Sequence, residues 1–151
     1  MSVWIRSFID AAETPSEKSI VRALVRWMRQ EETDEKITNR IAVYRHKTLL
    51  TNICILRWLD LCILLFLDQK LVEKNGFYSL NTLYSEFRRT IFYRFMDLLP
   101  KEELVRKIAS SMKRRFTFLY SLPWKNDGPE QLIPLLPTMG LPLEHTITMR
   151  K

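Results

Sequence analysis

The chain has 151 residues, enough for one domain of ordinary size, and its 46% hydrophobic content can build a core, which argues against wholesale disorder. Only three glycines are present, so tight turns are few, which disfavours β-sandwiches, β-barrels and glycine-rich nucleotide loops. The net charge of +7 favours an acidic partner, such as a nucleic acid, an anionic membrane or an acidic protein surface.

The first dozen residues predict a short amphipathic helix with one apolar face. Arg6 and Asp10 supply its polar side. The apolar residues at helical spacing, which are also the candidates for contact with a membrane interface, are Val3, Trp4, Ile5, Phe8 and Ile9. Three interpretations stay open for this segment: it packs on the core, it lies in a membrane interface, or it is disordered.

A helix is predicted to begin at Thr14, because Thr14 can cap it, Pro15 suits its first position and Glu17 completes a capping box. An apolar stripe continues this helix to Met28. A second helical pattern begins at Asp34 and leads into the apolar run 52–67.

The apolar run 52–67 predicts a buried central helix rather than a membrane span. It has only 16 residues, and Arg57 and Asp60 interrupt its centre as an i,i+3 pair. One unbroken helix over 34–73 would be about 60 Å long, more than the width of a domain of this size. We therefore expect a break near 47–52, or a long helix shared with a partner chain.

The second half of the chain predicts two more helices and then a tail. Ser79 caps a helix that ends before Pro100, and a further helix opens at 101–103. Five of the seven prolines fall in 123–142, so this region predicts an extended tail that lies along the domain or docks into another protein as a polyproline-type ligand. No segment of useful length alternates as a strand does.

These patterns predict an all-α fold. We expect a compact bundle of about four to five helices with a short N-terminal amphipathic helix and a Pro-rich extended C-terminal tail. The corresponding division of the chain is an N-terminal amphipathic segment at 1–13, a helical domain at 14–122 and a tail at 123–151.

The positive charge is concentrated in residues 88–115, which carry 9 Lys and Arg against 3 Asp and Glu and so hold +6 of the net +7. The stretch is either a solvated helix face or a docking patch. The candidate partner-binding residues are Arg88, Arg89, Arg94, Arg106, Lys107, Lys113, Arg114 and Arg115. Aromatic residues interleave with them, and their helical spacing favours a core role over base stacking: Phe92, Tyr93, Phe95, Phe116 and Phe118.

Residue types that carry catalysis are sparse. Cys54 and Cys62 lie in an apolar stretch and are interpreted as reduced core thiols of a cytosolic or nuclear protein. His46 and His145 are far apart, and no metal-ligand spacing, phosphate loop or serine elbow is present. We therefore expect no metal and no cofactor, and a binding or regulatory protein rather than an enzyme.

Two short strings resemble the accessory C proteins of paramyxoviruses. The residues that carry the resemblance are Trp27, Glu32, Thr33, Arg57, Trp58 and Leu59, in an order and spacing similar to those of the Sendai-type members. The string at 98–102 is similar to one in the measles-type members, and the N-terminal string at 3–9 looks like the membrane-attaching start of the longer C proteins. The resemblance covers about residues 20–105.

The resemblance implies a small, helical, non-enzymatic viral accessory protein. Its implied partners are host interferon-signalling proteins and the viral polymerase, with regulation of viral RNA synthesis and, in some members, help in budding. The implied location is the host cytoplasm, with the nucleus or a membrane surface as alternatives. A helical nucleic-acid-binding protein that uses the basic segment 88–115 on RNA is the competing hypothesis, and homo-oligomer formation is left open.

Overall fold

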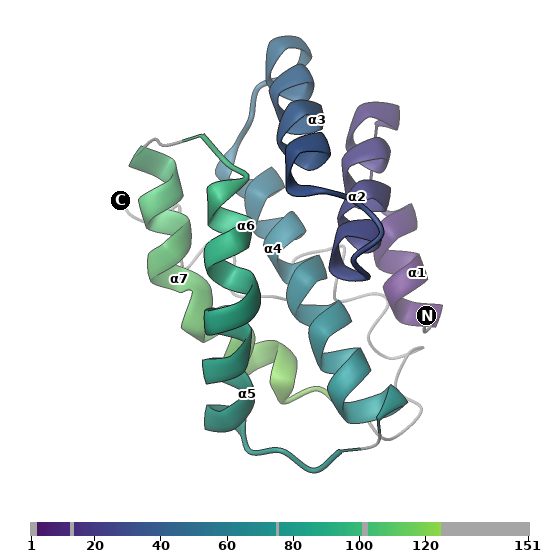
Figure 1. The fold of residues 1–151 in the computed structure, drawn as a ribbon, viewed down its shortest axis with the longest axis vertical. Coiled ribbons are helices and arrows are strands. Elements are labelled where there is room, and N and C mark those ends of the chain that lie inside the picture. Colours follow the sequence, from purple (N-terminus) through teal and green to yellow (C-terminus); the bar gives the residue numbers. More distant parts are fainter. Residues whose placement is uncertain (1–2, 13, 75, 101–102, 125–151) are drawn as a thin grey trace.

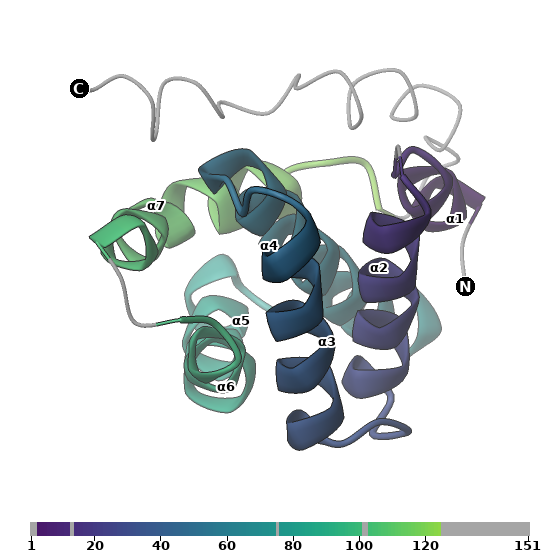
Figure 2. The same cartoon turned by 90° about the horizontal axis from the view of Figure 1, so that it is seen from above.

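The computed structural model describes residues 3–12, 14–74, 76–100 and 103–124. Within these residues all regular structure is helical, so the all-α prediction is confirmed. Helix α4 runs through the middle of the molecule, with α1, α2 and α3 on one side and α5, α6 and α7 on the other (Figure 1). Figure 2 shows the same arrangement from above, with α2 and α3 side by side.

The N-terminal half contains four helices: α1 (Val3–Asp10), α2 (Pro15–Met28), α3 (Asp34–Lys47) and α4 (Asn52–Leu67). The break predicted near 47–52 is confirmed, because α3 ends at Lys47 and α4 begins at Asn52. The N-terminal ends of α2, α3 and α4 are capped by the hydroxyl groups of Thr14, Thr33 and Thr51, each of which accepts a backbone N–H bond.

The later helices contain two π-helical stretches. Helix α4 continues into η1 (Asp68–Glu73), and α5 (Leu80–Phe87) continues through η2 (Arg88–Phe92) into α6 (Tyr93–Asp97). Helix α7 (Glu103–Tyr120) then runs back along α5 and α4. The predicted cap at Ser79 is confirmed, since its hydroxyl accepts the backbone N–H of Thr82 at 3.2 Å.

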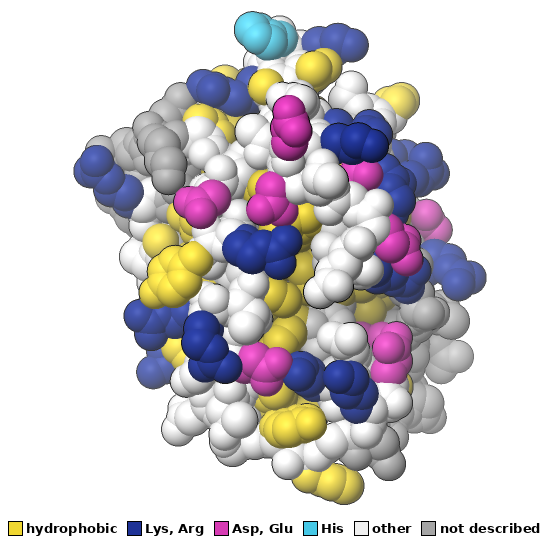
Figure 3. All heavy atoms as spheres, in the orientation of Figure 1, with side chains coloured by type: hydrophobic (Ala, Val, Ile, Leu, Met, Phe, Trp, Pro, Cys, Tyr) yellow, Lys and Arg dark blue, Asp and Glu magenta, His cyan; other side chains and the backbone are white. Residues whose placement is uncertain are grey.

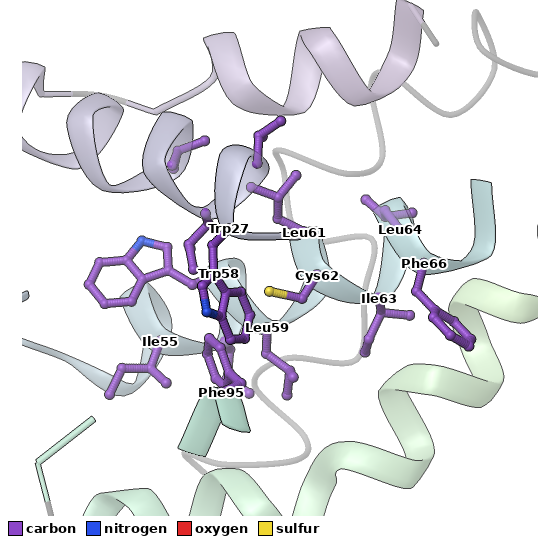
Figure 4. Packing of buried hydrophobic residues seen from close by; sticks show 14 of the residues in the cluster. Trp27, Ile55, Trp58, Leu59, Leu61, Cys62, Ile63, Leu64, Phe66 and Phe95 are labelled. Atoms are coloured by element: carbon purple, nitrogen blue, oxygen red, sulfur yellow. The ribbon is translucent and has the colours of Figure 1, made fainter. Parts of the chain in front are cut away.

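The core is built around α4, which is buried over most of its surface (Figure 4). Trp27 of α2 and Phe95 of α6 pack toward it from two sides, and Trp58 is completely buried. Trp124, just after α7, also belongs to this core. The packed part of the molecule thus extends past residue 122, and residues 125–151 lie outside the described residues, as does the prediction of an extended tail there.

Helix α1 turns its apolar face inward. Ile5, Phe8 and Ile9 are buried against α2 and α4, so of the three interpretations of this segment the structure shows core packing. These three residues therefore do not form an exposed face for a membrane; the side chains of Val3 and Trp4 lie outside the described part. None of the described helices combines the length and hydrophobicity needed to cross a bilayer.

Two predicted roles of charged residues are wrong. Glu17 was expected to complete a capping box, but its carboxylate accepts the guanidinium N–H of Arg57 at 2.6 Å. The i,i+3 pair of Arg57 and Asp60 does not form, because Asp60 pairs with Arg115 of α7 instead. Both charged residues of α4 therefore pair with a side chain on the neighbouring helix that they face, and not with each other.

Candidate functional site

Four exposed cations form a row along α7. Arg106 and Lys107 lie seven residues before Lys113 and Arg114, which is nearly two helical turns, so both pairs occupy the same face. Ser110 lies between the two pairs on that face and is also exposed. The opposite side of α7 carries the buried residues of the core, so this helix is basic outside and apolar inside.

Two further exposed cations come from the neighbouring helix. Arg88 and Arg89 begin η2, directly after α5, which packs against α7. Lys113 lies over the ring of Tyr84, 5.7 Å from its centroid, and so joins α7 to α5. We call the six exposed cations the basic surface: Arg88, Arg89, Arg106, Lys107, Lys113 and Arg114. In Figure 3 several Lys and Arg side chains gather at the lower left, over α5 and α7.

Arg88 is held in place by an aromatic neighbour within this surface. Its Nε donates to the hydroxyl oxygen of Tyr93 at 3.2 Å, and its guanidinium lies 6.0 Å from the ring centroid. The bond to Tyr93 raises the pKa of Arg88, which is charged at every physiological pH. Tyr93 is itself 52% exposed, so an aromatic ring and a fixed guanidinium face outward together.

The other two predicted partner-binding residues are placed differently. Arg115 is completely buried, so its assignment to an exposed patch is wrong: its Nε donates to Asp60 at 2.7 Å and its Nη2 donates to the other carboxylate oxygen. Burial raises the pKa of Asp60, and the Arg115 guanidinium opposes that shift. Arg94 is exposed, but it pairs with Asp34 at 3.1 Å and lies 4.8 Å from the ring centroid of Trp27.

The interleaved aromatic residues are mostly core. Phe92, Phe95 and Phe116 are buried, and Phe118 is half-buried. Tyr93 is the exception that faces solvent. A continuous base-stacking platform is therefore not built from these five residues, as the helical spacing predicted.

The residues that resemble the C proteins occupy structural positions. Trp58 and Leu59 are completely buried in α4, and Arg57 makes the ion pair to α2. Thr33 caps α3, and Glu32 lies 3.5 Å from Arg40 and 3.8 Å from Arg26. Trp27 is 2% exposed, and its indole N–H donates to Asp34 at 2.5 Å. These residues therefore hold α2, α3 and α4 together rather than forming an outer surface.

A polar cleft of about 380 Å³ lies where the end of α2 meets η1 and η2. Gln30, in its wall, adopts a positive φ of 62°, because Glu31 and Gln30 donate their N–H groups back to Arg26 and Trp27 and so end α2. Lys70 of η1 pairs across the cleft with Glu86 of α5 at 2.6 Å. The charges of the cleft are thus largely paired with one another.

An aromatic groove of about 630 Å³ lies beside the end of α7 and was not predicted from the sequence. It is bounded by residues 76–78 before α5 and by residues 120–124. The signal that could have pointed to it is Phe77-Tyr78 directly after Asn75-Gly76, two aromatic residues in a turn, where they are hard to bury.

Across the described ranges, no three His, Cys, Asp or Glu side chains come together in a way that could hold a metal ion. No family model, curated protein or solved structure matches the chain. The candidate site is therefore the basic surface, which is identified from the positions of its exposed cations and not from a relative.

Proposed function

We propose that this chain is a non-enzymatic docking protein, a viral accessory protein of the paramyxovirus C type. Its basic surface binds acidic surfaces of host interferon-signalling proteins and of the viral polymerase, and this binding lowers the interferon response and regulates viral RNA synthesis. The resemblance of the strings at 27–33 and 57–59, together with the helical fold, supports the family assignment. The proposed location is the host cytoplasm.

The observation that carries the proposal is the row of exposed cations on α7. Exposed cations in one row repel one another, and this repulsion is relieved when an acidic surface of a partner binds there. Among the described acidic side chains none makes an ion pair with Lys107, Lys113 or Arg114. Charges of this kind steer association and select the partner.

The exposed Tyr93 and Arg88 give this surface a second kind of contact. Tyrosine and arginine are enriched among the residues that carry most of the binding energy at protein interfaces. Because the hydrogen bond to Tyr93 already orders the Arg88 side chain, less side-chain entropy is lost on binding. A protein partner with an acidic patch beside an apolar one fits this surface.

The test compares two charge-matched variants of the full chain. Replacing Lys113 and Arg114 with Gln removes two charges from the basic surface, and replacing Arg22 and Lys36 with Gln removes two exposed charges from α2 and α3. We expect the first variant to lose most of its inhibition of an interferon-response reporter and of a viral polymerase reporter, with binding about tenfold weaker. The second variant should act as the parent chain does.

Two results would contradict this proposal. Equal activity of the two variants would show that the basic surface is not the contact region. Circular dichroism and thermal unfolding serve as the control that both variants remain folded. A coding sequence with no second long overlapping reading frame would remove the assignment to the C proteins.

Nucleic acid is the alternative partner, and the spacing of the four α7 cations along one exposed face favours it. Lys and Arg side chains are the usual ligands of nucleic-acid phosphates. RNA affinity should then fall steeply between 50 and 200 mM salt, because each neutralised phosphate releases a counterion. Weak RNA binding at low salt, or equal affinity of the two variants above, removes this alternative.

A further inference from the structure

The aromatic groove at the end of α7 lies outside the basic surface and has no role in the proposed function. Phe77 is 88% exposed and Tyr78 is 38% exposed, which is unusual for large apolar rings in one place. The wall residues that define the groove are Leu71, Phe77, Tyr78, Tyr120, Leu122 and Trp124. Contiguous exposed rings of this kind mark surfaces that bind another segment.

The groove is held in one shape by specific contacts. The hydroxyl of Tyr120 donates to the backbone carbonyl of Tyr78 at 2.8 Å, which ties the end of α7 to residues 76–78. The indole N–H of Trp124 donates to the carbonyl of Leu119 at 2.8 Å. A Cβ on Gly76 would lie 2.1 Å from the ring of Tyr78, so only glycine lets this ring fold back there.

The chemistry of such a groove suits an extended, proline-rich strand. Polyproline II segments dock between aromatic rings, and they lose little entropy because they are already extended before binding. Prolines with two residues between them place both rings on one side of that helix, which has three residues per turn. A ligand for this groove is therefore a Pro-x-x-Pro segment with apolar neighbours.

The chain itself contains such a segment close by in sequence. Pro134, Leu135, Leu136 and Pro137 form a Pro-x-x-Pro string that follows Leu132-Ile133. This string lies outside the described residues, and its chain leaves from Trp124, which is itself part of the groove wall. The seven residues 125–131 span at most roughly 25 Å when extended, which is long enough to turn back and short enough to keep the string concentrated at the groove.

We infer that residues 132–137 dock into the aromatic groove of their own chain. Docking covers the exposed rings of Phe77 and Tyr78. The groove is then a binding site for a proline-rich strand, and the same chain supplies that strand. This inference does not depend on the proposed function, because it uses neither the basic surface nor the resemblance to the C proteins.

The test uses a photo-crosslinking residue in the full-length chain. Phe77 is replaced by p-benzoylphenylalanine, which retains an aromatic ring at a position that is 88% exposed, and the products of illumination are mapped by mass spectrometry. We expect cross-links within one chain to residues 130–140. The matched control places the same group at Val43, an exposed apolar position (52%) on α3, and should give no such cross-links.

Proline variants then test which residues dock. Replacing Pro134 and Pro137 with Ser should reduce the intrachain cross-link at least fivefold, whereas replacing Pro129 and Pro142 with Ser should leave it unchanged. The inference is overturned if residues 130–140 are not cross-linked, if the cross-link joins two chains only, or if both proline pairs behave alike. Because all four prolines lie beyond the described helices, thermal unfolding is expected to confirm an intact helical part in every variant.

Discussion

At the scale of single residues, the Asp60–Arg115 pair is a charged pair inside the apolar core, where burying charge is costly. Both side chains are completely buried, and the two residues are 55 positions apart in the chain. Burial of two charges costs more than their attraction returns unless hydrogen bonds satisfy them. Here two guanidinium nitrogens donate to the two carboxylate oxygens, while the buried Nη1 of Arg115 has no hydrogen-bond partner among the described residues. The pair therefore fixes how α7 sits on α4.

Removing one partner of this pair should destabilise the protein severely. Asp60→Asn leaves Arg115 as a buried charge without a counterion, and we expect a loss of about 3–5 kcal/mol in the free energy of unfolding. Replacing both residues, with Leu at 60 and Met at 115, should recover most of that loss because no buried charge remains. Urea unfolding measures both; a double variant as unstable as Asp60→Asn would contradict this explanation.

Asp34 makes the stability of the fold depend on pH in the acid range. The Trp27 N–H bond and, after it, Arg94 hold the pKa of Asp34 below its usual value. An acid with a lowered folded-state pKa adds stability that is complete above its unfolded pKa of about 3.9 and is lost as pH falls through the folded value. Burial also acts on Asp60 and raises its pKa, but there the adjacent Arg115 guanidinium opposes the shift.

Asp34→Asn should therefore make the free energy of unfolding depend less on pH in the acid range. Asn keeps an oxygen for the Trp27 N–H but removes the charge, so we expect slightly lower stability at pH 7 and a shallower decline between about pH 4 and pH 2. Urea unfolding at a series of pH values tests this. Glu35→Gln, an exposed change in the same helical turn, serves as the control and should keep the parent slope.

At the scale of elements, helix starts were the most predictable feature, because a cap is a local signal. Thr14 and Ser79 were identified as caps from their neighbours alone, and their hydroxyl groups accept the expected N–H bonds. The two π-helical stretches, η1 and η2, could not be predicted, since each has ordinary helix-forming residues and depends on how the long helices meet.

The cap at Thr33 gives a test at this scale. Its hydroxyl accepts the backbone N–H of Lys36 at 3.2 Å, so Thr33→Ala leaves that group without its partner and should cost about 1 kcal/mol. Thr38→Ala, exposed in the interior of the same helix, should be neutral or slightly stabilising because alanine favours helix. Equal stability of the two variants in thermal unfolding would show that the cap contributes nothing.

At the scale of the whole molecule, the sequence predicted the class of fold and the break before α4 but not the ion-pair partners. Arg57 and Asp60 were paired because they are close in sequence, whereas each binds a residue on another helix, Glu17 or Arg115. The concentration of charge in 88–115 correctly located the exposed cations of α7. It could not show that Arg115 faces inward, because that depends on a single buried carboxylate far along the chain.

The position of α4 also implies an order of folding. Helix α3 meets α4 across 10 positions and α2 meets it across 40, whereas α7 must be brought back across 55 positions to meet Asp60. Local contacts form faster than distant ones because less loop entropy is lost. During synthesis the α7 side of α4 therefore stays uncovered until α7 has emerged, and in that interval the unfinished chain is most exposed to aggregation.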